Sequence, residues 1–531
     1  MGDNGLKRQK VGIIGVVGMI YAMTAAGAYG IEDMVSASGP GMTIIMLLVL
    51  PLVWAFPIAL ASCELGSAIP DECGFYRWVQ RALGEFWGFQ IGWLKNIGIY
   101  INVAVFIVLA TNYIASFAGL TNLQSYIVKV VLIVIFTWIN LRGIKDVAIV
   151  STIISGAILI AFAGITIIGF MHFSQNPFEP VVATGQTVVG SIGSSIAIGM
   201  WMYAGYESMS SLAGELENPQ VIPKGIILAL PLIIATYVLP TVSGVGSIGQ
   251  WDSWGSDGVS YINVAMKYAP VFGVGFMLVA VISNLSMFNV YLASGARGFF
   301  VMAEDNLAPK ILEKCDKKHG VPYVAILSLS IVSLILCMFH FDILVTIVSL
   351  FNMGLYSLIM ISQIVLRRKE PELARPYKIR LGKVGTDIFC AIPVLVAFIA
   401  LYINGTDYFV LGLIGMMTGP VAYIIFKRVY GGLYKNDPEK YPINHKTKLA
   451  VGDTKRIAIA FGLLSVLMII GRLFLPGYDD PQYYADFYGR ADIFGTFMNI
   501  VLIAGIACAI IAVIFASMYK KIDSAEKPQT N

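Results

Sequence analysis

The stretch TAAGAYGIEDM, residues 24–34, decides the fold, because it interrupts an otherwise apolar run that extends over residues 11–35. It contains Gly27 and Gly30, and the acid Glu32 follows directly. Glycine weakens a helix, and a carboxylate is costly in lipid and is therefore functional by default. The stretch predicts a membrane helix that is broken, with a functional site at the break.

The composition agrees with a membrane protein. Of 531 residues, 57% are hydrophobic and only 13% are charged, whereas a soluble domain has about 25% charged residues. The apolar residues form continuous blocks of about 20 residues, the length that a helix needs to cross a bilayer. We therefore predict an all-α integral membrane protein in the lipid bilayer, without an evident signal peptide. The predicted spans, about fourteen in number, are residues 11–37, 41–68, 86–117, 124–141, 147–171, 188–212, 224–249, 270–302, 322–340, 342–367, 387–404, 408–430, 456–475 and 492–518.

Lysine and arginine are distributed unequally between the two sides of this map. With the N-terminus inside, 31 of the 36 fall on inside segments and three fall on outside segments. This split is what the positive-inside rule predicts. We expect a multi-pass protein of the cell (plasma) membrane with both termini cytoplasmic. The net charge of +4 then reports topology and not binding to nucleic acid.

Several other functional classes are disfavoured. None of the six cysteines lies in a predicted outer loop, and the four histidines lack the spacing of metal ligands, so neither disulfides nor a metal site are expected. The phosphate-binding motif GxxxxGK[ST] is absent, which disfavours a primary pump. The membrane segments hold no convergent set of nucleophile and base. We therefore expect neither an enzyme nor a cofactor.

A second interruption occurs in the sixth predicted span, at YAGYESMSSLAGE, residues 203–215. Its Gly-x-Glu, Gly205 to Glu207, repeats the Gly-x-Glu from Gly30 to Glu32, five spans earlier. Because five is odd, the second unit is inserted upside down relative to the first. Matching interruptions in two inverted halves point to the binding site of a secondary transporter.

Such breaks have a physical use. Unwinding frees backbone N–H and C=O groups, which persist at mid-membrane only where they line a cavity or bind a ligand. The N-terminal ends of half-helices face anions and the C-terminal ends face cations. A zwitterionic amino acid presents both charges, so a small-molecule substrate of this kind is expected.

Four further stretches carry a resemblance to a known family. They are ELGSAIPDECGFYRWVQRALGEFWGF (64–89), GYESMSSLAGELENP (205–219), ARGFFVMAEDNLAPK (296–310) and LRRKEPELARPYKI (366–379). Together they resemble the amino acid–polyamine–organocation (APC) superfamily of permeases over roughly residues 8–430. The segment AYGIEDMVSASGPG (28–41) is most similar to the plant-type polyamine and amino acid permeases.

The resemblance implies the leucine-transporter fold, in which two inverted five-helix repeats surround the substrate and helices 1 and 6 are unwound. Four further C-terminal helices follow the repeats. The implied organisation is a cytoplasmic N-terminus (1–10), a first repeat (11–171), a second repeat (188–367), helices 11 and 12 (387–430), helices 13 and 14 (456–518) and a cytoplasmic tail (519–531).

The resemblance also implies the site. Amides near Gly30 would hold a substrate carboxylate, carbonyls near Met202 would hold an amino group, Trp201 would be a gate, and Glu207 would be an acid linked to pH. The implied substrate-binding residues are Gly27, Ala28, Tyr29, Gly30, Glu32, Asn102, Trp201, Met202, Ala204 and Gly205.

Some alternatives stay open. Ile158 stands where several proton-coupled relatives carry a lysine, so both exchange and proton symport remain options. Ser283 and Ser286 are expected to bond back to their own helix, with a sodium site as the alternative. Glu64, where the second span ends, is expected to reach the membrane interface.

The favoured function is a secondary transporter of amino acids that works by alternating access, as an antiporter or a proton-coupled symporter. The alternative is transport of polyamines or monoamines by the same fold. Glu32 separates the two, because it either takes the place of a substrate carboxylate or pairs with a distal ammonium. The sequence leaves the oligomeric state undetermined.

Overall fold

The computed structural model describes residues 13–24, 28–71, 74–142, 147–205, 221–255, 258–316 and 320–526. In these segments every named element is a helix, as predicted. The α-helices are α1 (Ile13–Thr24), α2 (Ile31–Ser38), α3 (Pro40–Leu50), α4 (Phe56–Ala68), α5 (Gly74–Leu83), α6 (Glu85–Ala118), α7 (Asn122–Leu141), α8 (Val147–Met171), α9 (Val188–Met202), α11 (Val221–Ile248), α12 (Tyr261–Tyr268), α13 (Pro270–Glu304), α14 (Tyr323–Leu336), α15 (Phe341–Lys369), α16 (Gly382–Ile403), α17 (Thr406–Tyr430), α18 (Asp453–Tyr478), α19 (Pro481–Tyr488) and α20 (Ile493–Glu526). Short helices of other types are η1 (Pro51–Ala55), η3 (Trp251–Ser253), η4 (Lys310–Glu313) and η5 (Gly432–Lys435).

The helices follow the predicted spans. Within the described segments, eleven helices are long and apolar enough to cross a membrane, and α9 and α14 are shorter apolar helices. Each predicted span coincides, in its described part, with one helix or with consecutive helices. The first span is divided into α1 and α2, and the second is a continuous run of α3, η1 and α4. The total of fourteen crossings and the five-plus-five repeat remain predictions.

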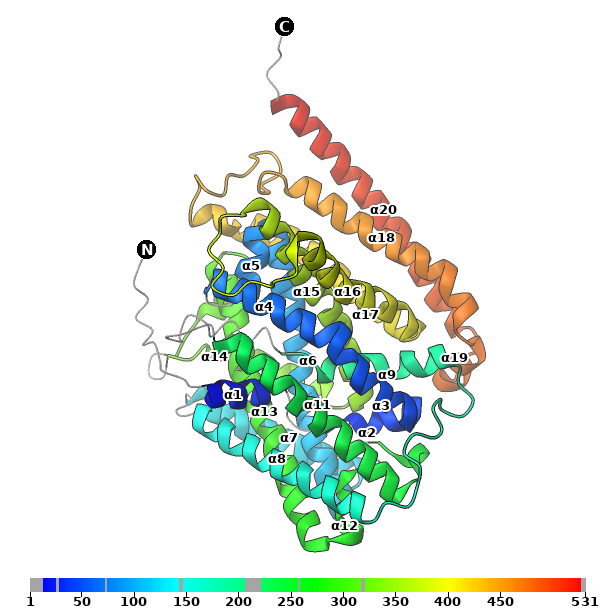
Figure 1. Cartoon of the computed structure of the whole chain (residues 1–531). Coiled ribbons are helices and arrows are strands. Elements are labelled where there is room, and N and C mark those ends of the chain that lie inside the picture. Colours follow the sequence, from blue (N-terminus) through cyan, green and yellow to red (C-terminus); the bar gives the residue numbers. More distant parts are fainter. Residues whose placement is uncertain are drawn as a thin grey trace.

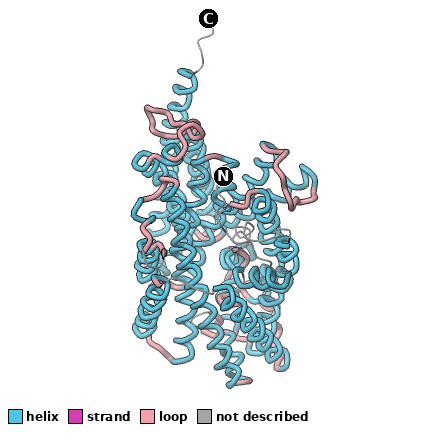
Figure 2. Tube along the Cα trace, turned by 90° about the vertical axis from the view of Figure 1, so that its left-hand side faces the viewer, coloured by secondary structure: helices cyan, strands magenta, loops and turns pink. Residues whose placement is uncertain are grey.

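Burial separates a central group of helices from a peripheral one. In the most apolar window, 78% of α6 and 72% of α15 are buried, against 17% of α20 and 11% of α7. Figure 1 shows α18 and α20 side by side along one edge of the molecule, and Figure 2 shows the long helices running in one general direction. Helices 13 and 14 of the predicted map therefore lie at the periphery, as their position outside the repeats suggested.

The polar segment between α18 and α20 holds the start of α17 in place. The Asp479 carboxylate accepts a hydrogen bond from the backbone N–H of Thr406, N to Oδ2 2.8 Å. The Tyr484 hydroxyl, on the short helix α19, donates to the same carboxylate oxygen over 2.8 Å. Since the first amides of a helix lack intrahelical partners, this loop stabilises the N-terminus of α17.

Glu64, at the end of the second predicted span, is held inside the protein and is not exposed on its surface. Glu64 is fully buried, and it accepts hydrogen bonds from the Arg367 side chain (Nε to Oε1 2.8 Å) and from the Ile379 amide (N to Oε2 2.8 Å). Arg375 Nε lies 3.3 Å from Oε1. A buried carboxylate is stable only when it is paired, and these partners come from α15 and from the loop that follows α15. The sequence gives no sign that this distant loop folds back over the end of α4.

Candidate functional site

The first break lies between α1 and α2, and its last residue requires glycine. Gly30 has φ of +91°, a conformation that glycine adopts without steric cost. A Cβ atom built on Gly30 would lie 2.3 Å from Cζ of Phe341. The prediction of a broken first helix is confirmed for the described residues, which resume at Ala28.

The side chain of Glu32, which follows this break, forms a hydrogen bond with the backbone of the break itself. Glu32 is buried, and its Oε2 accepts a hydrogen bond from the Gly30 N–H over 2.8 Å. Its Oε1 accepts a hydrogen bond from the Tyr113 hydroxyl over 2.6 Å. An amide that the sequence assigned to a substrate carboxylate is therefore occupied by a carboxylate of the chain itself.

The second break follows α9, which ends at Met202. Gly205 has φ of +111°, and its N–H donates to the Tyr356 hydroxyl over 3.1 Å. The carbonyl oxygen of Met202 accepts a hydrogen bond from the Tyr237 hydroxyl over 3.0 Å. Because a carbonyl oxygen has two lone pairs, Met202 retains capacity for a second donor, such as a substrate ammonium.

Trp201 and Asn102 meet, although 99 residues separate them in the sequence. The indole Nε1–H of Trp201 donates to Asn102 Oδ1 over 2.9 Å. The indole also packs edge-on against Phe341 at 5.7 Å between ring centroids, and in a tilted arrangement against Phe106 at the same distance. Phe341 of α15 thus contacts Trp201 near the end of α9 and closely approaches Gly30 at the first break.

A cavity lies between the two breaks. Its walls include Tyr29, Asn102, Trp201, Met202, Ala204 and Gly205, all of them predicted substrate-binding residues. Ala28, Gly30 and Glu32 are buried close by but are not part of its walls. The space open to the centres of water molecules is about 40 Å³, enough for a few waters.

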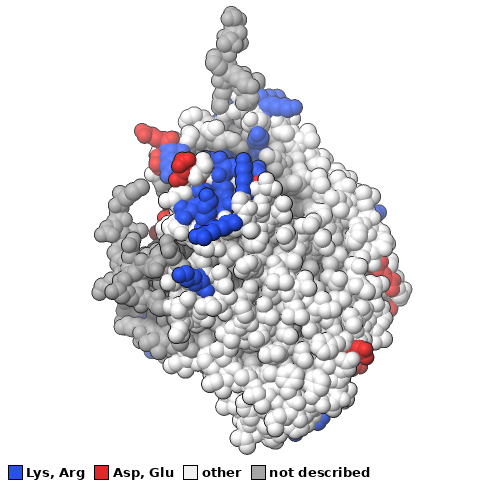
Figure 3. Space-filling model, viewed as in Figure 1, with Lys and Arg blue, Asp and Glu red and all other residues white. Residues whose placement is uncertain are grey.

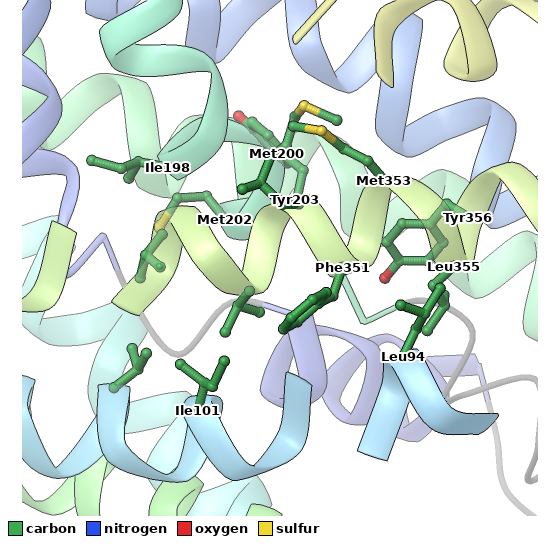
Figure 4. Close-up of a cluster of buried hydrophobic side chains, with 14 of the residues drawn as sticks. Leu94, Ile101, Ile198, Met200, Met202, Tyr203, Phe351, Met353, Leu355 and Tyr356 are labelled. Carbon is green, nitrogen blue, oxygen red and sulfur yellow. The ribbon is translucent and has the colours of Figure 1, made fainter. Parts of the chain in front are cut away.

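Apolar packing closes one side of this region. Figure 4 shows Met200 and Met202 of α9, and Tyr203 directly after it, near Phe351, Met353 and Tyr356 of α15, with Leu94 and Ile101 of α6 facing them. Methionine side chains adapt easily to changes in shape.

The cavity is rich in acceptors and aromatic rings. Asn284 is fully buried, and within the described part of the chain its Oδ1 has no hydrogen-bond partner. The Thr24 hydroxyl, at the end of α1, is also buried there without a partner among the described residues. Both side chains line the cavity, together with the rings of Tyr29 and Tyr291. Acceptors and aromatic faces are the groups that bind an ammonium.

One cation also faces the cavity. Lys95 of α6 is among the lining residues, and its Nζ lies 5.9 Å from the centroid of the Phe75 ring. No aspartate or glutamate lines the cavity among the described residues. The cavity therefore offers groups for both ends of a zwitterion.

Two predicted site residues, Gly27 and Glu207, lie outside the described residues. Several lining residues escaped prediction, among them Asn284, Tyr237 and Tyr356. Nothing in their local sequence distinguishes them from the other polar and aromatic residues of apolar helices. Ser283 donates to the Ala280 carbonyl over 3.0 Å, the back-bonding that was expected. No group of three metal-ligating side chains occurs in the part of the chain searched.

Comparisons with known proteins agree with this geometry. A family model described as amino acid permease matches residues 12–422. The chain is 28% identical over 429 residues to the polyamine transporter RMV1 of Arabidopsis thaliana, covering 79% of this chain and 86% of that protein. It is 30% identical over 386 residues to the polyamine transporter PUT1 of Oryza sativa subsp. japonica, covering 71% and 70%. It is also 26% identical over 467 residues to the branched-chain amino acid permease BcaP of Bacillus subtilis (strain 168), covering 81% and 96%.

Proposed function

The chain belongs to the amino acid permease family, and from this membership we propose that it is a secondary transporter that moves a small organic amine by alternating access. The cavity between the two broken helices is the proposed substrate site. Its small volume in this conformation supports a cycle in which the walls part to admit substrate. Secondary transporters of this kind place their substrate where two inverted repeats meet.

Among amines, we favour polyamines or monoamines over amino acids. The observation that carries this choice is the hydrogen bond from Gly30 to Glu32. A substrate carboxylate would have to displace Glu32 from this amide, and two carboxylates in one buried place repel each other. A substrate without a carboxylate avoids that cost. The names of the plant relatives, which are polyamine transporters, support the same choice.

Amino acids are the second candidate, and Lys95 is the observation that favours them. Lys95 is among the residues that line the cavity, and a cationic side chain in the wall favours a substrate with a carboxylate over a polyamine. The relative BcaP, named as a branched-chain amino acid permease, supports this candidate.

A thermal-shift screen of the purified protein tests both candidates. A ligand present at a hundred times its Kd stabilises the folded state by about 2.7 kcal/mol. We expect putrescine and spermidine to raise the Tm and neutral amino acids to leave it unchanged. The opposite pattern favours the second candidate. Uptake of the stabilising compound into sealed vesicles, with an amine that gives no shift as the control, then tests transport itself.

The coupling of substrate transport to protons or to a second substrate is a proposal that rests on the sequence. Ile158 replaces a lysine found in several proton-coupled relatives, which leaves exchange and proton symport as the two options. Glu207 is the proposed proton-linked acid. Glu207→Gln is expected to flatten the pH dependence of uptake while ligand-induced thermal stabilisation is retained. An unchanged pH profile would remove Glu207 from this role.

A further inference from the structure

The segment between α15 and α16, residues 370–381, binds a buried acid on one side and carries basic side chains on the other. Its inner side holds the buried Glu64 of α4, through Arg375 and the amide of Ile379. Its outer side is strongly basic, and Figure 3 shows Lys and Arg side chains gathered near the upper end of the molecule. The basic residues over this region are Arg367, Arg368, Lys369, Arg375, Lys378, Arg380 and Lys383.

Some of these cations have acidic partners within the protein. Arg367 and Arg375 bind Glu64, and Arg368 forms an ion pair with Asp387. Within the described segments, the other four form no ion pair. Lys369 donates to the Arg81 carbonyl over 3.3 Å, and Lys378, Arg380 and Lys383 are exposed. Lys378 and Arg380 stand on either side of the buried Ile379, as expected for an extended segment whose side chains point to opposite sides, and Lys383 lies in the first turn of α16.

Glu370, the acid at the start of this segment, is already paired with Arg81 of α5. The Arg81 guanidinium donates to both carboxylate oxygens of Glu370, with Nη2 to Oε2 at 2.7 Å. These hydrogen bonds hold the pKa of Glu370 below its usual value, so this carboxylate stays charged and paired with Arg81. It does not neutralise the three exposed cations.

These cations lie where the chain enters the membrane. Leu381, Val384 and Ile388 are apolar and are 50%, 70% and 59% exposed. Large apolar side chains that are this exposed at the start of a membrane-spanning helix face lipid tails. Lys378, Arg380 and Lys383 therefore stand at the boundary between lipid tails and water, the depth of phospholipid headgroups.

We propose that Lys378, Arg380 and Lys383 bind the headgroup of an anionic phospholipid, and that the bound lipid stabilises the segment that holds Glu64. Basic residues directly beside a membrane span bind anionic lipids, with about 1 kcal/mol for each Lys or Arg, a factor of roughly five in affinity. The leaflet is the one on the side of this loop, which the charge distribution predicts to be cytoplasmic.

The run from α3 through η1 to α4 contains Glu64 near its end and packs against the substrate site, although no residue of this run is among those that line the cavity. Its middle contacts one residue of the cavity wall. There the Trp54 ring packs edge-on against the lining residue Tyr356 at 5.5 Å. The Leu47 carbonyl accepts a hydrogen bond from the Tyr203 hydroxyl over 2.7 Å. A lipid that fixes one end of this run is thus placed to change the rate at which the cavity opens.

The test compares two double variants of the full-length protein. K378Q/R380Q removes two of the proposed lipid contacts, and both side chains are exposed, so the fold is retained. K446Q/K448Q makes the same change of charge at exposed positions of another predicted cytoplasmic loop. Native mass spectrometry counts the phosphatidylglycerol molecules that each protein retains. We expect K378Q/R380Q to bind phosphatidylglycerol on the order of thirtyfold more weakly, and the control to bind it like the wild type.

Uptake in vesicles of phosphatidylcholine, with or without phosphatidylglycerol, provides the second readout. We expect phosphatidylglycerol to change the uptake rate of the wild type and of K446Q/K448Q but not of K378Q/R380Q. If both double variants retain phosphatidylglycerol like the wild type, the proposed lipid site is wrong. It is also wrong if both double variants lose the lipid to the same extent. If inorganic phosphate reproduces the effect in neutral vesicles, the ligand is a free anion and the lipid assignment is wrong. Lipid retention is independent of transport, so the site is tested even if the proposed function fails.

Discussion

The hydroxyl of Tyr113 donates to Glu32 Oε1 over 2.6 Å, and both side chains are buried. Tyr113 belongs to α6, the most buried of the candidate membrane spans. Its ring also packs edge-on against Tyr29 at 5.3 Å, and Tyr29 lines the cavity. The carboxylate beside the first break is therefore held by a central helix of the protein, one aromatic ring away from the proposed substrate.

Glu32→Gln should separate the two classes of substrate. Glutamine keeps the size of the side chain but removes its charge and presents an NH₂ group to one of two donors. Loss of the buried negative charge next to the cavity removes part of the electrostatic attraction for a substrate ammonium, so we expect polyamine uptake to fall on the order of tenfold. Uptake of a neutral amino acid should be spared. Equal loss for both substrates would show that Glu32 only supports the fold.

Tyr113→Phe provides the matched variant, because it removes one hydrogen-bond donor from Glu32 and leaves the charge. We expect a smaller loss of polyamine uptake than for Glu32→Gln, together with a lower Tm, since the buried oxygen loses a partner. Uptake and Tm measured on the same preparations distinguish an effect on the site from an effect on stability.

Valine at Gly30 or Gly205 should abolish substrate binding in a protein that still inserts. Both glycines have φ near or above +90°, which a β-branched residue resists, and a Cβ atom at Gly30 would collide with Phe341. The measurement is the loss of ligand-induced thermal stabilisation. Gly98→Val in α6 is the control, because a Cβ atom at Gly98 meets nothing within 4 Å. Normal substrate affinity in both test variants would show that these two glycines serve only helix packing.

Trp201→Ala should weaken substrate affinity by up to about thirtyfold, the effect of losing one desolvated cation–π contact of about 2 kcal/mol. Trp54 is unsuitable as a control, because it contacts Tyr356 in the cavity wall. Trp138 of α7, which is 53% exposed, is the better control. Similar small effects from Trp201→Ala and Trp138→Ala would place Trp201 outside the site.

The buried ion pair between Glu85 and Lys427 should show strong coupling. Lys427 Nζ lies 2.6 Å from Glu85 Oε1, and both residues are buried at the ends of α6 and α17. Removing one partner leaves the other charge buried without a counter-charge, so Lys427→Met should lower the free energy of unfolding by about 3–5 kcal/mol. Glu85→Gln with Lys427→Met should cost clearly less. Thermal unfolding in detergent measures both, and strictly additive losses would contradict the coupling.

Cysteine labelling tests the predicted topology. Asp480 and Lys440 are both exposed and lie in loops predicted to be on opposite sides. In a chain with Cys73 and Cys315 replaced by serine, an impermeant thiol reagent applied outside should label Asp480→Cys and not Lys440→Cys. Labelling of Lys440→Cys alone would invert the map.

The sequence by itself determined the features that depend on local composition. Hydrophobic blocks predict helices because backbone groups in lipid must be satisfied within the segment, and the observed helices coincide with those blocks. The break between α1 and α2 was predictable as well, since glycine beside a carboxylate in an apolar run is a local signal. For the sixth predicted span, the described residues show that α9 ends at Met202, just before Gly205. The expectation that Trp201 and Asn102 face one cavity followed from resemblance to a known fold, and the hydrogen bond between them was not predicted.

Only the tertiary structure decided which polar groups satisfy one another. The partners of Glu32 are an amide two residues away and a tyrosine 81 residues away, and the second cannot be read from the sequence around either residue. Glu64 is the clearer case, because its position at the end of a span suggested the membrane interface without any partner, and its arginines come from residues more than 300 positions later. A buried charge takes whichever partner the packing of the helices brings near, and that packing is a property of the whole chain.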